Sequence, residues 1–215
     1  MTATRLAGQG ATRSRLRGAA IWAALATALI LPLAVAATSP QLAWREPVYI
    51  IGGFAGVMGL ALMVLQPLLA AGYLPGLGLR AGRRAHGWIG AALVAAVTVH
   101  VGGLWITSPP DVIDVLLFRS PTPFGVWGAV AMWAVVAAAL LALVRRRWRL
   151  SPRIWRVGHT ALAVIGVIST VVHAMLIEGT MGQVSKALLC ALVLVVAIKV
   201  AVDLRAWTLL LRRRA

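Results

Sequence analysis

Four histidines are the residues of this sequence whose type and spacing suggest chemistry, and they are its only histidines. His100 follows His86 by 14 positions, and His173 follows His159 by the same interval. In a helix, 14 residues rise about 21 Å and complete two heptads, so the two histidines of one helix lie on the same face. Neutral imidazole is a common metal ligand. Two such helices facing each other would therefore present two imidazoles at each of two levels.

The segments that carry these histidines are expected to cross a membrane, because the chain is strongly apolar. Hydrophobic residues make up 61% of the sequence and charged residues only 12%, whereas a soluble domain has about 25% charged residues. A helix needs about 20 apolar residues to span a bilayer. The sequence therefore predicts an all-α integral membrane protein built as a six-transmembrane helix bundle. The predicted spans are residues 19–37, 48–71, 86–107, 124–144, 155–177 and 187–207.

The distribution of charge predicts how these spans are oriented. Arginines cluster in both terminal tails and in the second and fourth connections, while the other side has only Arg45, Arg119 and Lys186 as basic residues. The positive-inside rule then places both termini in the cytoplasm. We divide the chain into a basic cytoplasmic tail (1–18), a six-helix domain (19–207) and a second basic tail (208–215). The net charge of +16 is explained by these connections, so we expect no binding to nucleic acid.

This orientation pairs the histidines across the third and fifth spans, which run in the same direction. His86 and His159 share the inner level, and His100 and His173 share the outer level. Two facing imidazoles can provide both axial ligands of a haem iron, so we predict two b-type haems between these spans. Cys190 is the only cysteine, which excludes attachment through a Cys-x-x-Cys-His motif. Zinc is disfavoured because neither level has an acid or cysteine ligand, and a purely structural role would not explain the shared spacing.

For other residues near the histidines, two explanations of their presence fit the sequence. Haem propionates are anionic and could contact Arg83, Arg84 or Arg156 near the inner level, and Arg119 or Lys186 near the outer edge, although topology signalling also explains these arginines. Small residues could leave room for a macrocycle or allow close helix packing. These are Gly87, Gly90, Gly102, Gly103, Gly158 and Gly166.

Three local features complete the expected topology. Residues 111–118 begin with acids and continue with apolar residues, which predicts a short interfacial helix on the outer side. Lys199 and Asp203 are four apart and should face each other on the last span. The segment near Ala34 also resembles a signal cleavage site. Its apolar stretch is longer than that of a usual signal, so we expect it to be retained; cleavage would leave five spans.

From about residue 48 to 207 the chain resembles the ferric reductase-like transmembrane domain family. That family includes the membrane parts of ferric reductases and NADPH oxidases, and the haem subunit of the bacterial methionine-sulfoxide reductase system. The resemblance is carried by His86-x13-His100 and His159-x13-His173, and by the stretches Ser-Pro-Pro-Asp-Val-Ile-Asp from Ser108 and Arg-Ser-Pro-Thr-Pro-Phe from Arg119. It implies an oxidoreductase component in the bacterial inner membrane that carries electrons from the cytoplasmic to the outer face.

The resemblance has one departure, which concerns the electron donor. Ferric reductases and NADPH oxidases carry a flavin and nicotinamide domain after the last span, but only about eight residues follow Trp207 here. We therefore expect FAD or FMN only on a partner protein, with a cytoplasmic flavoprotein or quinol as the donor. The acceptor could be a ferric chelate, oxygen or a periplasmic redox protein.

Two other functional classes share some of these features. A quinol-linked di-haem cytochrome b subunit of a respiratory complex also has paired histidines, although the Pro-Glu-Trp-Tyr signature of its quinol site is absent here. A transporter would be expected to line a path with polar residues, and the first, second and fourth spans have almost none.

Overall fold

The computed structural model describes residues 2–145 and 147–204, with side chains from residue 13 onward. The described chain is helical throughout, and six of its helices are long and apolar enough to cross a membrane, as predicted. The parts of the predicted last span and C-terminal tail beyond residue 204 lie outside the described residues. The elements are α1 (Thr2–Ala37), the 3-10 turn η1 (Pro40–Leu42), α2 (Pro47–Ala71), α3 (Leu79–Thr107), α4 (Pro109–Leu116), α5 (Pro123–Val144), α6 (Pro152–Leu176) and α7 (Gln183–Asp203).

Proline sets the start of four of these helices. It occupies the first turn of α2, α4, α5 and α6, where its missing N–H is not needed by the helix. The end of α2 is a left-handed glycine, Gly72, with φ of 73°, the usual way to end a helix. Pro32 and Pro67 lie inside α1 and α2 without ending them.

All six spans begin earlier than predicted, and two of them do so by seven residues or more. The third span was predicted from residue 86, but α3 begins at Leu79. The first was predicted from residue 19, but α1 is helical from Thr2. Both extensions are rich in arginine and glycine, and a search for apolar runs detects only the part of a helix that lies in lipid. The predicted short helix is present as α4, although it ends at Leu116.

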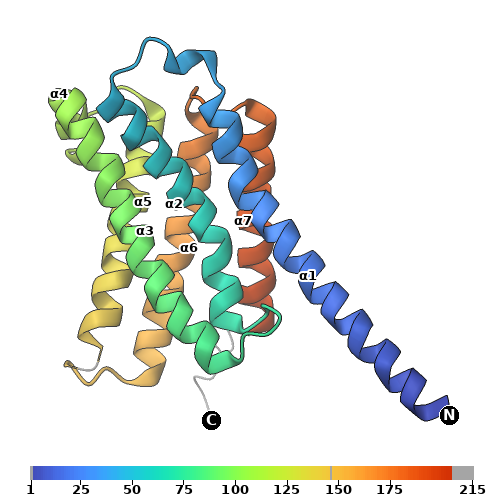
Figure 1. The fold of residues 1–215 in the computed structure, drawn as a ribbon. Coiled ribbons are helices and arrows are strands. Elements are labelled where there is room, and N and C mark those ends of the chain that lie inside the picture. The colour runs from blue at the N-terminus through green and yellow to red at the C-terminus, as the bar shows by residue number, and fades with distance from the viewer. Residues whose placement is uncertain (1, 146, 205–215) are drawn as a thin grey trace.

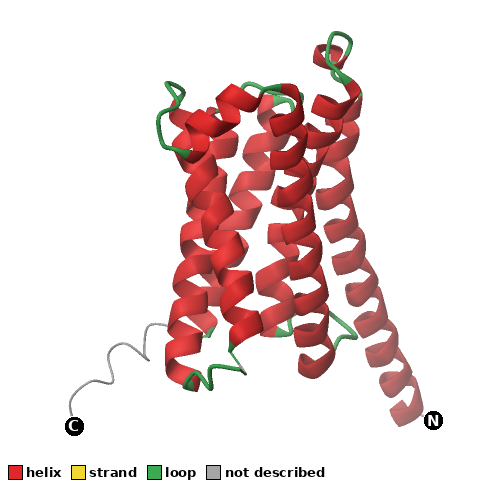
Figure 2. Cartoon of the chain, turned by 90° about the vertical axis from the view of Figure 1, so that its left-hand side faces the viewer, coloured by secondary structure: helices red, strands yellow, loops and turns green. Residues whose placement is uncertain are grey.

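The helices form a bundle with all connections at its two ends (Figure 2). One end, here called the basic end, carries the α2–α3 connection (residues 72–78) and the α5–α6 connection (residues 145–151) (Figure 1). The opposite end, here called the α4 end, carries α4, η1 and the α6–α7 loop (residues 177–182). Because α3 and α6 both begin at the basic end, they run in the same direction, as the histidine pairing requires.

The bundle is organised as two helical hairpins, with α2 packed against α3 and α5 packed against α6. α7 packs against both hairpins through α2 and α6. α1 packs against α2 and α7, and its N-terminal part diverges from the bundle (Figure 1). The best-buried side chains lie where α2 meets α7, and include Val64, Leu60, Val193 and Leu189. The apolar core therefore lies beside α2 and α7, and the facing sides of α3 and α6 are left for the histidines.

Candidate functional site

The four histidines form two pairs, each joining α3 to α6. The ring centroids of His86 and His159 lie 6.1 Å apart with their planes at 76°. Those of His100 and His173 lie 6.4 Å apart at 78°. The side chains that the sequence predicted to share a level are therefore brought together, and the two pairs stand at two depths of the bundle. Their role as ligands stays a prediction.

The separation within each pair fits an iron between the two rings. Imidazole nitrogens bind first-row metals at about 2.0–2.1 Å, and each coordinating nitrogen lies about 1 Å from its ring centre, so the centroids of two axial ligands should be about 6 Å apart. Among the described residues, no three His, Cys, Asp or Glu side chains are close enough together to hold a metal ion. Each level thus offers two imidazoles, which suits a haem whose macrocycle supplies the remaining ligands.

Backbone carbonyls of the neighbouring helices orient three of the four rings. His86 Nδ1 lies 3.0 Å from the carbonyl oxygen of Gln66, and His100 Nδ1 lies 2.8 Å from that of Gly52, both on α2. His173 Nδ1 lies 2.8 Å from the carbonyl oxygen of Phe124 on α5. A carbonyl can only accept, so Nδ1 carries the proton and Nε2 is left free to bind a metal.

His159 is oriented differently. Its Nδ1 is buried and has no hydrogen-bond partner among the described residues, although the carbonyl of Ala138 on α5 faces it. The ring instead stacks on Trp155, with centroids 5.5 Å apart and planes at 12°. The Arg145 guanidinium lies 4.1 Å from the Trp155 ring centre. Stacking and a cation–π contact therefore hold the imidazole that lacks a hydrogen bond.

The carbonyls that face the four histidines repeat the spacing of the histidines. Gly52 and Gln66 on α2 are 14 residues apart, and so are Phe124 and Ala138 on α5. Sequence reasoning missed these residues, because every residue has a backbone carbonyl. A carbonyl that accepts a hydrogen bond does not restrict the type of its residue. The side chain of Gln66 was also overlooked; its amide nitrogen is buried and without a partner among the described residues, near Gly90 of α3.

Most of the glycines singled out from the sequence serve helix packing. A Cβ on Gly103 would lie 3.0 Å from the Gly52 Cα, and one on Gly158 would lie 3.2 Å from a methyl of Leu141. Gly87 and Gly102 face open space. The glycines that touch the histidine rings are Gly56 and Gly128, on α2 and α5, and neither was among the glycines predicted from the sequence.

The charged residues near the site occupy varied environments. Arg83, Arg84 and Arg156 are exposed at the basic end, and Arg119 is exposed at the α4 end. Lys186, expected near the outer edge, is only 4% exposed and donates a hydrogen bond of 2.5 Å to the carbonyl of Ile177. It is therefore a buried lysine that ties α7 to the end of α6.

The predicted pair on the last span is present at the basic end. Lys199 Nζ lies 2.7 Å from an Asp203 carboxylate oxygen. The hydroxyl of Tyr73, just beyond α2, donates to the same carboxylate, and this bond raises the pKa of Tyr73 above its usual value. The group is exposed, so its contribution to stability is small.

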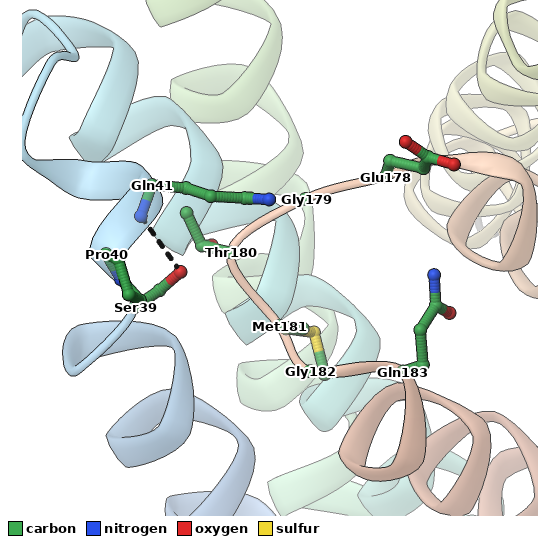
Figure 3. A pocket seen from close by; sticks show the side chains of 9 residues that line it. All are labelled: Ser39, Pro40, Gln41, Glu178, Gly179, Thr180, Met181, Gly182 and Gln183. Atoms are coloured by element: carbon green, nitrogen blue, oxygen red, sulfur yellow. Dashed lines mark hydrogen bonds between the residues drawn. The ribbon is translucent and has the colours of Figure 1, made fainter.

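A separate cavity of about 390 Å³ opens at the α4 end, between the α1–α2 connection and the α6–α7 loop (Figure 3). It is lined by polar groups that include Gln41, Glu178 and Gln183. The four histidines lie outside this lining, so the cavity is distinct from the paired-histidine site.

Comparison with known proteins places this geometry in a family. The family described as "Ferric reductase like transmembrane component" matches residues 55–170, more than half of the chain. The match is shorter than the range expected from the sequence, and it includes His86, His100 and His159 but ends three residues before His173. No match was found among curated proteins or among solved structures. The chain is therefore a multi-pass membrane protein that belongs to the ferric reductase-like transmembrane component family.

Proposed function

We propose that this protein is a transmembrane electron carrier that holds two b-type haems, one between His86 and His159 and one between His100 and His173. The observation that carries the proposal is the pair of imidazole–imidazole separations, 6.1 and 6.4 Å, at two levels of the same two helices. Family membership supports it, since electron transfer across the membrane is the activity this family suggests. By helix geometry the two irons would lie about 20 Å apart.

The residues of this chain perform three tasks in that function. The Nδ1 contacts of His86, His100 and His173 leave the Nε2 atoms of these rings free to bind an iron. The hairpins α2–α3 and α5–α6, which α7 joins through α2 and α6, carry one proposed ligand helix each. The apolar spans exclude water from the space between them. A bound haem would supply the one-electron chemistry of its iron.

The direction of flow and the partners are part of the proposal. The arginine-rich basic end is expected in the cytoplasm, so electrons would enter near His86 and His159 and leave near His100 and His173. A cytoplasmic flavoprotein, or quinol from the membrane, would donate them. A ferric chelate, oxygen or a periplasmic redox protein would accept them.

A haem count with a redox titration in membranes tests the proposal. We expect two haems per chain, with a b-type absorption spectrum and two low-spin titrating components. A purified wild-type protein without haem would contradict the function. Addition of a flavoprotein with NADPH in one sample, and of a quinol analogue in another, then separates the two classes of donor, since only the competent one should reduce both haems.

A further inference from the structure

We propose that Gly56 of α2 and Gly128 of α5 are positioning residues that set the orientation of His100 and His173. At each position the missing side chain leaves the space in which an imidazole lies against the backbone of the neighbouring helix. The inference rests on the proposed function, because it assigns these glycines to one of the two haem positions, the one at the α4 end.

The distances at both glycines are too short for a side chain. A Cβ built on Gly56 would lie 2.9 Å from Nδ1 and 3.0 Å from Cε1 of His100. A Cβ built on Gly128 would lie 2.7 Å from the same two atoms of His173. Non-bonded carbon atoms are comfortable at about 3.5–4.0 Å. Alanine at either position would therefore require the imidazole or the helix to move.

The rings are not free to move away from these glycines. Each Nδ1 is held at 2.8 Å by a backbone carbonyl one helical turn earlier: Gly52 for His100 and Phe124 for His173. Glycine and carbonyl therefore stand in the same i, i+4 relation on both helices. The hydrogen bond directs the ring along the glycine face, and the absence of a Cβ allows the bond to form.

The arrangement is specific to one level. The residues four positions after the other two carbonyls, Gln66 and Ala138, are Ala70 and Ala142 rather than glycine. Near the His86–His159 pair, the adjacent glycines Gly87 and Gly158 do not contact the rings: a Cβ on Gly87 would meet nothing within 4 Å, and one on Gly158 would meet Leu141. A substitution at Gly56 or Gly128 should therefore disturb one haem and leave the other in place.

Ordinary helix packing is the competing explanation, because small residues also let membrane helices approach closely. The packing glycines of the α2–α3 interface behave differently, since a Cβ on Gly103 would meet backbone atoms of α2. At Gly56 and Gly128 the nearest atoms all belong to a histidine ring. A packing role predicts a general loss of stability, whereas a positioning role predicts a change in one haem.

The test compares Gly56→Ala and Gly128→Ala with two matched controls in the full chain. Gly53→Ala lies on the same helix as Gly56, and Gly78→Ala lies just before α3; a Cβ at either control position meets nothing within 4 Å. Haem content, midpoint potentials and the low-spin ferric EPR signals are measured in membranes. We expect each test variant to lose or shift the haem that His100→Ala removes, with the other haem unchanged. The controls should match the wild type.

Retention of the second haem also reports that the bundle has folded. Unchanged haem content, potentials and EPR signals in both test variants would overturn the inference while leaving the proposed function intact. So would an equal loss of both haems, or an effect confined to the haem of His86 and His159. A wild-type protein without haem would instead overturn the proposed function, and the inference with it.

Discussion

At the scale of single residues, the histidines owe their orientation mostly to backbone groups. Three of the rings contact carbonyl oxygens of α2 or α5 at 2.8 to 3.0 Å. Such outer contacts fix the tautomer of a metal-binding imidazole and increase its basicity, and their loss typically costs about 10–100-fold in metal affinity. His159 is the exception, because it relies on the Trp155 ring.

The pairing predicts which substitutions share a phenotype. His86→Ala and His159→Ala should each remove the same haem, and His100→Ala and His173→Ala should each remove the other, because the two histidines proposed to bind one iron lie at one level. Haem content and redox titration of the four variants check this. The double variant His86→Ala/His159→Ala should retain as much haem as either single one. Loss of different haems by His86→Ala and His159→Ala would reject the parallel arrangement of α3 and α6.

The stacked ring of Trp155 leads to a prediction at one level only. Trp155→Ala should weaken haem retention at the His86–His159 pair by up to about tenfold, because an aromatic pair contributes about 0.5–1.5 kcal/mol. Haem dissociation measured with an acceptor protein checks this, and Trp155→Phe should restore most of the retention. Trp133→Ala is the control, since that side chain is exposed on α5. An equal effect of both alanine variants would mean that the stack does not orient His159.

At the scale of helices, close approach of α2 and α3 positions His86 and His100. Glycines line this interface at both ends: Gly82 approaches the Leu69 carbonyl, and Gly103 approaches Gly52. Lipid does not drive membrane helices together as water does, so backbone approach at small residues supplies much of the packing energy. The hairpin therefore carries His86 and His100 as one unit.

Adjacent glycines on α3 allow a matched test of this packing. Gly103→Ala should destabilise the protein by about 1–3 kcal/mol, the usual cost of overpacking, since its Cβ would lie 3.0 Å from the Gly52 Cα and 3.1 Å from the Val48 carbonyl oxygen. Gly102→Ala should be neutral or slightly stabilising, because its Cβ meets nothing within 4 Å. Thermal unfolding in detergent measures both. Similar midpoints for the two variants would contradict this account of the interface.

At the scale of the whole molecule, charge separates the two ends of the bundle. Exposed arginines near the start of α3 and in the α5–α6 connection lie at the basic end, while Asp111, Asp114 and Glu178 lie at the α4 end. The positive-inside rule predicts that the basic end faces the cytoplasm.

Cysteine labelling tests this orientation directly. The native Cys190 is buried, so Cys190→Ala provides the background for single cysteines at Arg147→Cys on the basic end and Gly179→Cys on the α4 end. A membrane-impermeant maleimide should label Gly179→Cys in spheroplasts and Arg147→Cys only after lysis. The reverse pattern would invert the proposed direction of electron flow.

The sequence by itself determined the number of spans, the short helix α4 and the partners within each histidine pair. These follow from apolar length, loop signals and helical periodicity, all of which are local properties of the chain. The starts of α1 and α3 were placed too late for the same reason, since helix outside the bilayer has no apolar signature.

Only the tertiary structure decided what surrounds each histidine. It identified the acceptor carbonyls of Gly52, Gln66 and Phe124, the glycines against His100 and His173, and the stack on Trp155. It also placed Lys186 in the interior rather than at a surface. These features depend on the relative placement of helices far apart in the sequence. Every residue has a backbone carbonyl, and the sequence does not show whether a glycine faces lipid, another helix or an imidazole.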